Sequence, residues 1–257
     1  ATMLARTVPV KALVIEPIGG LSTGAVVPPA RYFHDIREIC SRHGVYLVFD
    51  EILCGAGRSG RFFTAHHWPD ALPDIIVMAK GLAAGYSPLG AMLAPAAMVD
   101  ELAGLSGCEF TYSYNANPVS CAAGAAVLDE FERLGLVERA RTMGATLRAG
   151  LDAIMERSPI LGDVRGIGLL LAVEMVADKA SKEMLPDNCL PTERIRVHGL
   201  ENGVLLYSRP TAGSRLGHWF MVAPPLTIGA AECQELLRRT EAAVGAFHRE
   251  LVSAGVV

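Results

Sequence analysis

The stretch Asp74-Ile75-Ile76-Val77-Met78-Ala79-Lys80-Gly81 decides the fold, because it reads as a sheet strand that ends on a lysine. Its β-branched apolar run is typical of a strand packed on both faces. The chain has four lysines, and Lys80 alone lies between such a strand and a glycine-rich turn. A lysine shielded from water there offers its amine for Schiff-base chemistry, so Lys80 is a candidate nucleophile. The alternative is a solvated strand-end lysine, since most lysines are surface residues.

A second strand brings an acid to the same place. Val45-Tyr46-Leu47-Val48-Phe49 runs directly into Asp50 and Glu51. Open parallel sheets bind ligands at the carboxyl ends of their strands, so neighbouring strands would set Asp50 and Lys80 on one crevice. A pyridoxal phosphate (PLP) enzyme needs this pair. The lysine holds the aldehyde as an imine, and the carboxylate keeps the pyridine nitrogen protonated.

Six segments, in order along nearly the whole chain, resemble the signature of the class III, omega-type, PLP-dependent aminotransferases. They are Ile15-Glu16-Pro17-Ile18-Gly19-Gly20, Phe49-Asp50-Glu51-Ile52 with Gly55-Ala56-Gly57-Arg58-Ser59-Gly60, Met78-Ala79-Lys80-Gly81, Thr111-Tyr112-Ser113 with Asn117-Pro118, Val164-Arg165-Gly166-Ile167-Gly168, and Ala223-Pro224-Pro225-Leu226. The resemblance implies fold type I, an α/β fold whose large domain has a mostly parallel sheet. It also implies a PLP-dependent enzyme that moves an amino group from an amine or amino acid to a 2-oxo acid.

The resemblance assigns roles to particular residues. Lys80 would be the Schiff-base lysine and the acid-base group that moves the substrate proton. Asp50 would pair with the pyridine nitrogen, and Ile52 would press on one ring face. Thr111 matches the family threonine that reaches the phosphate of the neighbouring subunit's cofactor, which implies a dimer or larger homo-oligomer. Glu51 is expected to hydrogen-bond buried backbone.

Three departures bear on the substrate. Family branches that admit 2-oxoglutarate through a glutamate–arginine pair carry those charges where this chain has Leu21 and Met221, so a pyruvate-type acceptor is favoured. Arg215 lies in a turn-rich segment where the amine:pyruvate branch can carry a mobile arginine, and a guanidinium binds a carboxylate bidentately. A solvated loop arginine is the equally open alternative. Leu53 stands where many relatives have a glutamine near the cofactor ring.

The order of elements is α/β at first and then changes character. Strands are expected at 12–15, at the runs ending at Phe49 and Met78, and at 90–94, with a helix at 29–42 and a long buried helix from Pro118 to about Leu134. Beyond it we expect an amphipathic helix at 137–158, one strand-like run at 164–175, a loop at 187–192, short strands at 203–208 and 219–222, and a helix at 230–251. The predicted domains are therefore 1–135, part of a PLP-binding large domain, and 136–257, a helical connection with a small α+β domain.

Composition agrees with a metabolic enzyme. The chain has 257 residues, 51% apolar and 19% charged, with a formal net charge of −4, so it can bury a core and has no basic footprint for nucleic acid. No apolar run approaches the length of a membrane span. The six cysteines lack metal-site spacing and are expected to be free thiols in a reducing cytoplasm, with no metal.

Members of this family carry a phosphate-binding glycine-serine loop ahead of the Glu16-Pro17 strand, and this chain shows none there. A phosphate dianion needs such a nest of N–H groups. We therefore expect a complementary amino-terminal portion, as a separate chain, a cleaved fragment or an undetermined segment. Two other functions stay open: a PLP-dependent decarboxylase or racemase on the same scaffold, and a non-catalytic subunit. The shared presence of Asp50, Lys80 and Thr111 argues against the subunit.

Overall fold

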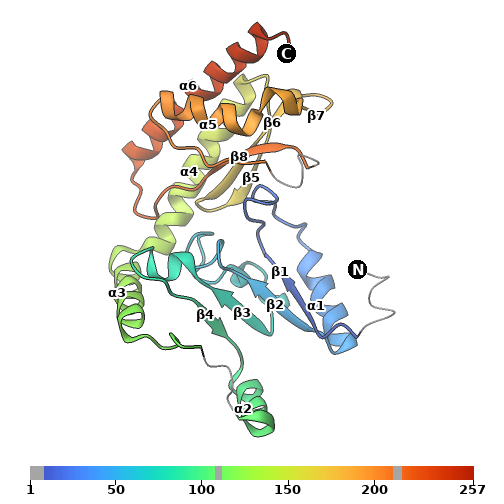
Figure 1. The fold of residues 1–257 in the computed structure, drawn as a ribbon, viewed down its shortest axis with the longest axis vertical. Helices are drawn as coiled ribbons and strands as arrows, with labels where there is room; N and C mark the ends of the chain where they lie inside the picture. The colour runs from blue at the N-terminus through green and yellow to red at the C-terminus, as the bar shows by residue number, and fades with distance from the viewer. Residues whose placement is uncertain (1–8, 108–111, 211–215) are drawn as a thin grey trace. The chain divides into compact units, whose positions relative to one another are not determined.

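The computed structural model describes residues 9–107, 112–210 and 216–257. The chain forms two compact units (Figure 1). Unit 1 comprises Ala1–Pro17, Pro28–Gly57 and Arg61–Gly135, and unit 2 comprises Ile18–Val27, Arg58–Gly60 and Leu136–Val257. Unit 2 begins its long segment at residue 136, where the sequence predicts a domain boundary. The segments 18–27 and 58–60, which the sequence assigned to the first domain, also belong to unit 2.

Unit 1 is built on a four-stranded sheet in the order β1-β2-β3-β4. Strands β1, β2 and β3 are parallel, and β4 runs antiparallel to β3. All four were expected from their apolar runs, and their bounds are β1 Ala12–Ile15, β2 Tyr46–Asp50, β3 Ile75–Met78 and β4 Ala91–Leu93. The predicted strand ends at Phe49 and Met78 are confirmed to within one residue.

One face of this sheet is covered by α1 (Tyr32–His43), which ends at Gly44 in the left-handed conformation that glycine adopts readily. Phe33 and Cys40 of α1 pack against Leu47 and Phe49 of β2 in a buried cluster. Side chains alternate between the faces of a strand, so the residues between these lie on the opposite face.

That opposite face is open in the part of the chain that the structure describes. Val14, Tyr46 and Met92 are 62%, 48% and 64% exposed, and Val14 pairs with Val48 of β2, as Met92 pairs with Val77 of β3. Within β3 itself, Ile75, Ile76 and Val77 are half-buried and Met78 is buried, so the expected packing of β3 on both faces is only partial for the described residues.

Unit 2 holds a four-stranded antiparallel sheet in which β6 pairs with β5, β7 and β8. The bounds are β5 Leu161–Ile167, β6 Leu170–Asp178, β7 Glu183–Met184 and β8 His218–Val222. The run predicted as one strand at 164–175 is a hairpin, because Gly168 has φ +62° and turns the chain back. The strand predicted at 203–208 is reduced to a single bridge between Tyr207 and Met221.

Three helices pack on this second sheet around a buried apolar cluster. They are α4 Leu136–Arg157, α5 Pro191–Glu201 and α6 Ala230–Ser253. The helices α4 and α6 were predicted. Helix α5 was not, because its sequence, PTERIRVHGLE, has few apolar residues at helical spacing. Its start is nevertheless marked by Pro191 in the first turn, where the missing N–H costs nothing.

The other helices of unit 1 are α2 (Ala96–Ser106) and α3 (Pro118–Leu134). Asn117 caps α3 by accepting hydrogen bonds from the N–H groups of Val119 and Ser120. The sequence predicts a buried α3, but its buried residues are Gly124, Val127 and Phe131. The alanine-rich remainder is mostly exposed, since the described residues give α3 one packing face. None of the helices in the described ranges is long and apolar enough to cross a membrane.

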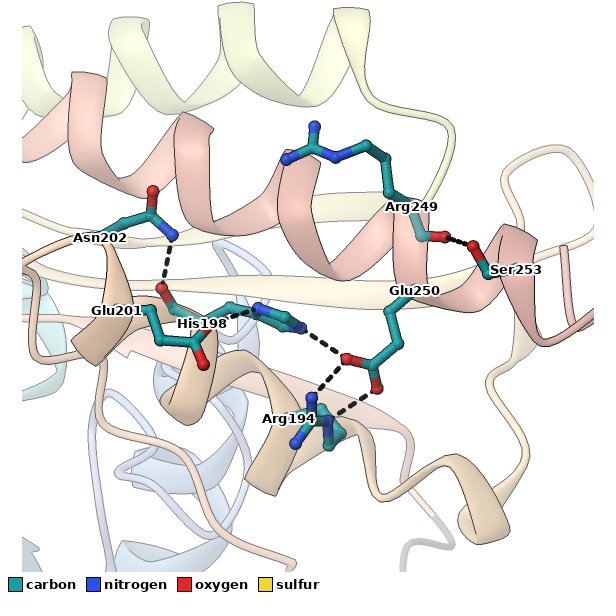
Figure 2. Close-up of polar contacts among 7 residues, drawn as sticks. All are labelled: Arg194, His198, Glu201, Asn202, Arg249, Glu250 and Ser253. Atoms are coloured by element: carbon teal, nitrogen blue, oxygen red, sulfur yellow. Dashed lines mark hydrogen bonds and ion pairs between the residues drawn. The ribbon is translucent and has the colours of Figure 1, made fainter.

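A polar cluster joins α5 to α6 (Figure 2). Arg194 donates from Nε to Oε1 of Glu250 at 2.7 Å, and Nε2 of His198 lies 2.7 Å from Oε2 of Glu250. The other ring nitrogen of His198, Nδ1, lies 3.0 Å from Oε2 of Glu201. The His198 side chain is 11% exposed, so these contacts are part of the packing of the two helices.

Acid is expected to loosen this cluster. The Arg194 guanidinium, and then His198, hold the pKa of Glu250 below its usual value of 4.5. A lowered pKa means that the stabilisation is present above the unfolded value and is lost as the pH falls through the folded one. Glu250→Gln should therefore flatten the fall in unfolding free energy roughly between pH 5 and pH 3. Because the Glu250 side chain is 35% exposed, we expect a loss of about 1 kcal/mol at neutral pH.

Urea unfolding at several pH values measures this effect. Glu241→Gln is the matched control, since Glu241 lies on the same helix and pairs with Arg157 between exposed side chains. The control should change the unfolding free energy by less than about 0.5 kcal/mol. An acid response of the Glu250 variant that equals the wild type would show that the cluster adds no pH dependence.

Candidate active site

Asp50 is the last residue of β2 and lies at the carboxyl edge of the parallel strands. It pairs with Val77 of β3 across the ladder. Its Oδ1 accepts a hydrogen bond from the N–H of Ile52 at 3.0 Å, which orients the half-buried carboxylate against its own backbone. Asp50 and Ile52, both expected at the site, are thus held together in one turn.

Lys80 follows β3 on the same edge, three residues after the partner of Asp50. Its φ is +42°, a left-handed conformation that costs a non-glycine residue about 1 kcal/mol. Strained backbone of this kind is concentrated at functional sites, and here it is observed at the residue that the sequence singled out. The expectation that Lys80 is shielded from water is wrong for the described residues, because its side chain is exposed.

The two lysines of unit 2, Lys179 and Lys182, are hydrogen-bonded to backbone. Nζ of Lys179 donates to carbonyl oxygens at the end of α4, with Met155 O at 2.5 Å, and Lys182 donates to the carbonyl of Gly162. Lys80 instead lines an open hollow of about 630 Å³ with Ala79, Gly85 and the segment 87–90.

The loop that carries Lys80 is supported from two sides within unit 1. A Cβ built on Gly81 would lie 3.2 Å from Cβ of Ala56, so the chain after Lys80 rests on the glycine-rich turn after Asp50. On the other side, Ser87 Oγ and Ser120 Oγ of α3 lie 2.8 Å apart. A Cβ on Gly124 would lie 2.5 Å from Cδ2 of Leu89. The glycines permit this close approach of the loop.

Glu51 is buried, with 1% of the residue exposed. Its Oε2 accepts from the N–H of Thr64 at 2.6 Å and its Oε1 from the N–H of Ala65 at 2.7 Å. The expected structural role for Glu51 is confirmed. Arg58, in the glycine-rich segment after Asp50, donates to the carbonyl oxygens of Leu169 and Pro224.

The side chains at this edge of the sheet fit the chemical groups of PLP. Asp50, which ends β2, would offer a carboxylate for the pyridine nitrogen, and Lys80, which follows the parallel neighbour β3, would offer an amine for the aldehyde. Thr111, predicted for the phosphate, and Arg215, predicted for the substrate carboxylate, lie outside the described residues. No group of histidine, cysteine, aspartate or glutamate in the described ranges could hold a metal ion.

One further arginine was passed over in the sequence. Arg209 lines a cavity of about 150 Å³ in unit 2, together with Arg196, Ser208 and His218. In the sequence, Arg209 could have been noticed because it directly follows the strand predicted at 203–208. Leu21 and Met221, the positions without the charged pair, are both buried in unit 2, at 7% and 4% exposure.

Comparison with known proteins assigns the family. The family model described as aminotransferase class-III matches residues 3–244. The chain belongs to this family. An uncharacterized aminotransferase, YodT, of Bacillus subtilis is 35% identical over 93% of this chain and 54% of its own length. A leucine/methionine racemase of Thermococcus litoralis is 35% identical over 91% of the chain and 50% of its own.

The structural comparison agrees. The class-III chain matches an amine transaminase from an uncultivated Pseudomonas species, solved in its PLP-bound form, with a TM-score of 0.84 and 36% identity. The match covers 95% of this chain and 54% of the other. The fold is therefore that of fold-type-I PLP-dependent transferases, and PLP is the cofactor of the family. The chain spans about half the length of these relatives.

Proposed function

We propose that the protein transfers an amino group from an amine or amino acid to a 2-oxo acid. The observation that carries this proposal is that Asp50 ends β2 and Lys80 follows β3, its parallel neighbour, at the same edge of the sheet in a class-III chain. PLP, when bound, supplies an electron sink for the substrate's α-carbon. The side chains of the protein contribute by placing charge and by moving protons.

Each residue has a defined task in this proposal. With PLP bound, the Nζ amine of Lys80 would hold the cofactor's aldehyde carbon, and the amine of Lys80 would move a proton to and from the substrate carbon. The carboxylate of Asp50 keeps the ring nitrogen protonated, and the N–H of Ile52 holds that carboxylate in place. Exposure of Lys80 to an open hollow gives both partners of the reaction access to its amine.

A pyruvate-type acceptor is favoured over 2-oxoglutarate. The positions that would carry a glutamate–arginine pair are the buried, apolar Leu21 and Met221. A second carboxylate would have no charged partner from these two residues. Arg215 remains the sequence-based proposal for the single carboxylate that pyruvate carries.

The alternative is a PLP-dependent racemase or decarboxylase. The similarity to a leucine/methionine racemase supports the racemase. The two are separated by incubating the PLP-loaded protein with L-alanine. Transamination yields pyruvate and converts the cofactor to pyridoxamine phosphate. D-alanine with no pyruvate would show racemisation, and carbon dioxide release would show decarboxylation.

We also propose that the active protein contains at least two copies of this chain and a complementary amino-terminal portion. The open face of the unit 1 sheet and the greater length of the relatives support it. Thr111 is expected to serve a neighbour's phosphate. Each charge-assisted hydrogen bond to an ionised group contributes about 1.5–3 kcal/mol, so losing three or so weakens cofactor binding by several powers of ten.

The purified chain alone should therefore bind PLP weakly and stay colourless. Absorbance titration with PLP, combined with size-exclusion chromatography and mass measurement, checks this expectation. In the active form, the complementary portion should be present, either on the same polypeptide or on one that copurifies. A lone 27.3 kDa monomer that holds PLP tightly and turns over would refute the proposal of a complementary portion.

A further inference from the structure

Glu51 is a charged group in the interior that the reaction does not use. Its carboxylate is bound by two backbone N–H groups, those of Thr64 and Ala65, at 2.6 and 2.7 Å. Both oxygens accept from N–H donors, which is the arrangement that suits an ionised carboxylate. Burial raises the pKa of this carboxyl, and the N–H groups of Ala65 and Thr64 oppose that rise. The site thus keeps a carboxylate where an apolar residue would avoid the desolvation cost.

The hydrogen bonds of Glu51 close a loop. Residues 52–63 leave β2, pass through the glycine-rich turn 55–60 and return to the short helix η2 (Thr64–His67). The residue before η2, Phe63, has no side-chain cap, so Glu51 satisfies the first N–H groups of η2 from the far end of the loop. Thr64 Oγ1 also donates to the carbonyl of Cys54 at 2.7 Å.

This loop contacts Asp50 and the residue that follows Lys80. At its start, the N–H of Ile52 orients the Asp50 carboxylate, and the N–H of Glu51 itself donates to Val77 O at 2.9 Å. In its middle, Ala56 supports Gly81, the residue after Lys80. Gly55 has no room for a side chain, since a Cβ there would lie 2.9 Å from Oε2 of Glu51. The loop therefore has little freedom while Glu51 holds its ends.

We propose that Glu51 is a positioning residue that keeps Asp50 and Lys80 in one geometry by clamping the loop between them. This inference rests on the proposed function. It adds to that function the residue that would fix the positions of Asp50 and Lys80 relative to each other. Misplacing a reacting group by about 1 Å can cost about a hundred-fold in rate. A residue that touches neither substrate nor cofactor can therefore control the rate.

Glu51→Gln tests the proposal in the PLP-loaded protein. The amide is nearly isosteric, but its NH2 group faces one of the two N–H donors, so one bond is lost. We expect the hydrogen exchange of the Thr64–Ala65 amides to rise about ten-fold or more. The kcat for transamination should fall about ten- to a hundred-fold with KM changed less than about three-fold. The midpoint of the pH titration of the bound cofactor's visible absorbance should also shift. Glu38→Gln, at an exposed glutamate of α1, is the control and should leave all three readouts unchanged.

A second pair of variants covers the case in which Glu51→Gln fails to fold. Thr64→Pro removes the N–H that binds Oε2 together with the hydroxyl, whereas Thr64→Val removes the hydroxyl alone. Proline is tolerated at the first position of a helix, and Phe63 before it has an extended backbone, with φ −97° and ψ 126°. The proline variant should have the lower kcat and the shifted titration relative to the valine variant.

Two outcomes would overturn the inference. One is a Glu51→Gln protein with faster amide exchange but with kcat and titration midpoint as in the wild type, which would leave Glu51 a purely structural role. The other is identical kinetics for the two Thr64 variants. Failure of the proposed function gives a different result from failure of this inference. In that case the wild-type protein itself would form no pyruvate from alanine.

Discussion

Lys80→Ala is expected to lower transamination by several orders of magnitude and to remove the visible absorbance of the bound cofactor, because the covalent attachment and the proton shuttle are lost together. The measurement is single-turnover pyruvate formation from alanine, with an absorbance spectrum of the PLP-saturated variant. Undiminished turnover in this variant would remove Lys80 from the mechanism.

Lys80→Gly is the matched variant for this experiment. It should be as inactive as Lys80→Ala. It should nevertheless unfold at a higher temperature, since glycine adopts the observed φ of +42° without the cost of about 1 kcal/mol that alanine carries. Equal stabilities of the two variants would contradict the strained conformation of Lys80, whereas activity in either would contradict its chemical role.

Asp50→Asn is expected to leave the cofactor bound but to cripple it, because a neutral amide cannot hold the pyridinium proton. A hydrogen bond between ionised groups contributes about 1.5–3 kcal/mol, so the loss of this bond alone lowers the rate by about 10- to 150-fold. The kcat of the half-reaction and the retained PLP absorbance measure the two parts of the effect.

Asp74→Asn is the control at the opposite end of the neighbouring strand. Asp74 pairs with Arg37 at 2.8 Å and accepts from the N–H of Leu47 at 2.7 Å, so its loss should affect stability and leave the PLP chemistry intact. Wild-type rates for Asp50→Asn would show that another group protonates the ring nitrogen.

The placement of Asp50 and Lys80 at the same edge of the sheet was predictable because it depends on local signals. Each residue follows a β-branched or aromatic run, and parallel neighbours bring their carboxyl ends to one edge. The buried role of Glu51 was also predictable, but through the family resemblance, which implied hydrogen bonds to buried backbone. Family motifs then supplied the chemistry that the strands alone could not specify.

Other features were not visible in local patterns. The hairpin at Gly168 interrupts a run that is apolar on both sides of the turn, so periodicity alone reads it as one strand. Helix α5 has too few apolar residues to signal itself. The burial of α3 and of Lys80 was overestimated because burial depends on whatever packs from outside, and the described residues of unit 1 cover one face of its sheet. Thr111 and Arg215 remain sequence-based proposals.

The central claim is that Lys80 carries the cofactor, and reduction with borohydride tests it most directly. The PLP-saturated protein is reduced, which converts a carbon–nitrogen double bond between lysine and cofactor into a stable single bond, and then digested for peptide mass spectrometry. We predict the pyridoxyl label on the peptide that contains Lys80. A label on Lys11, Lys179 or Lys182 with Lys80 unmodified would contradict the account.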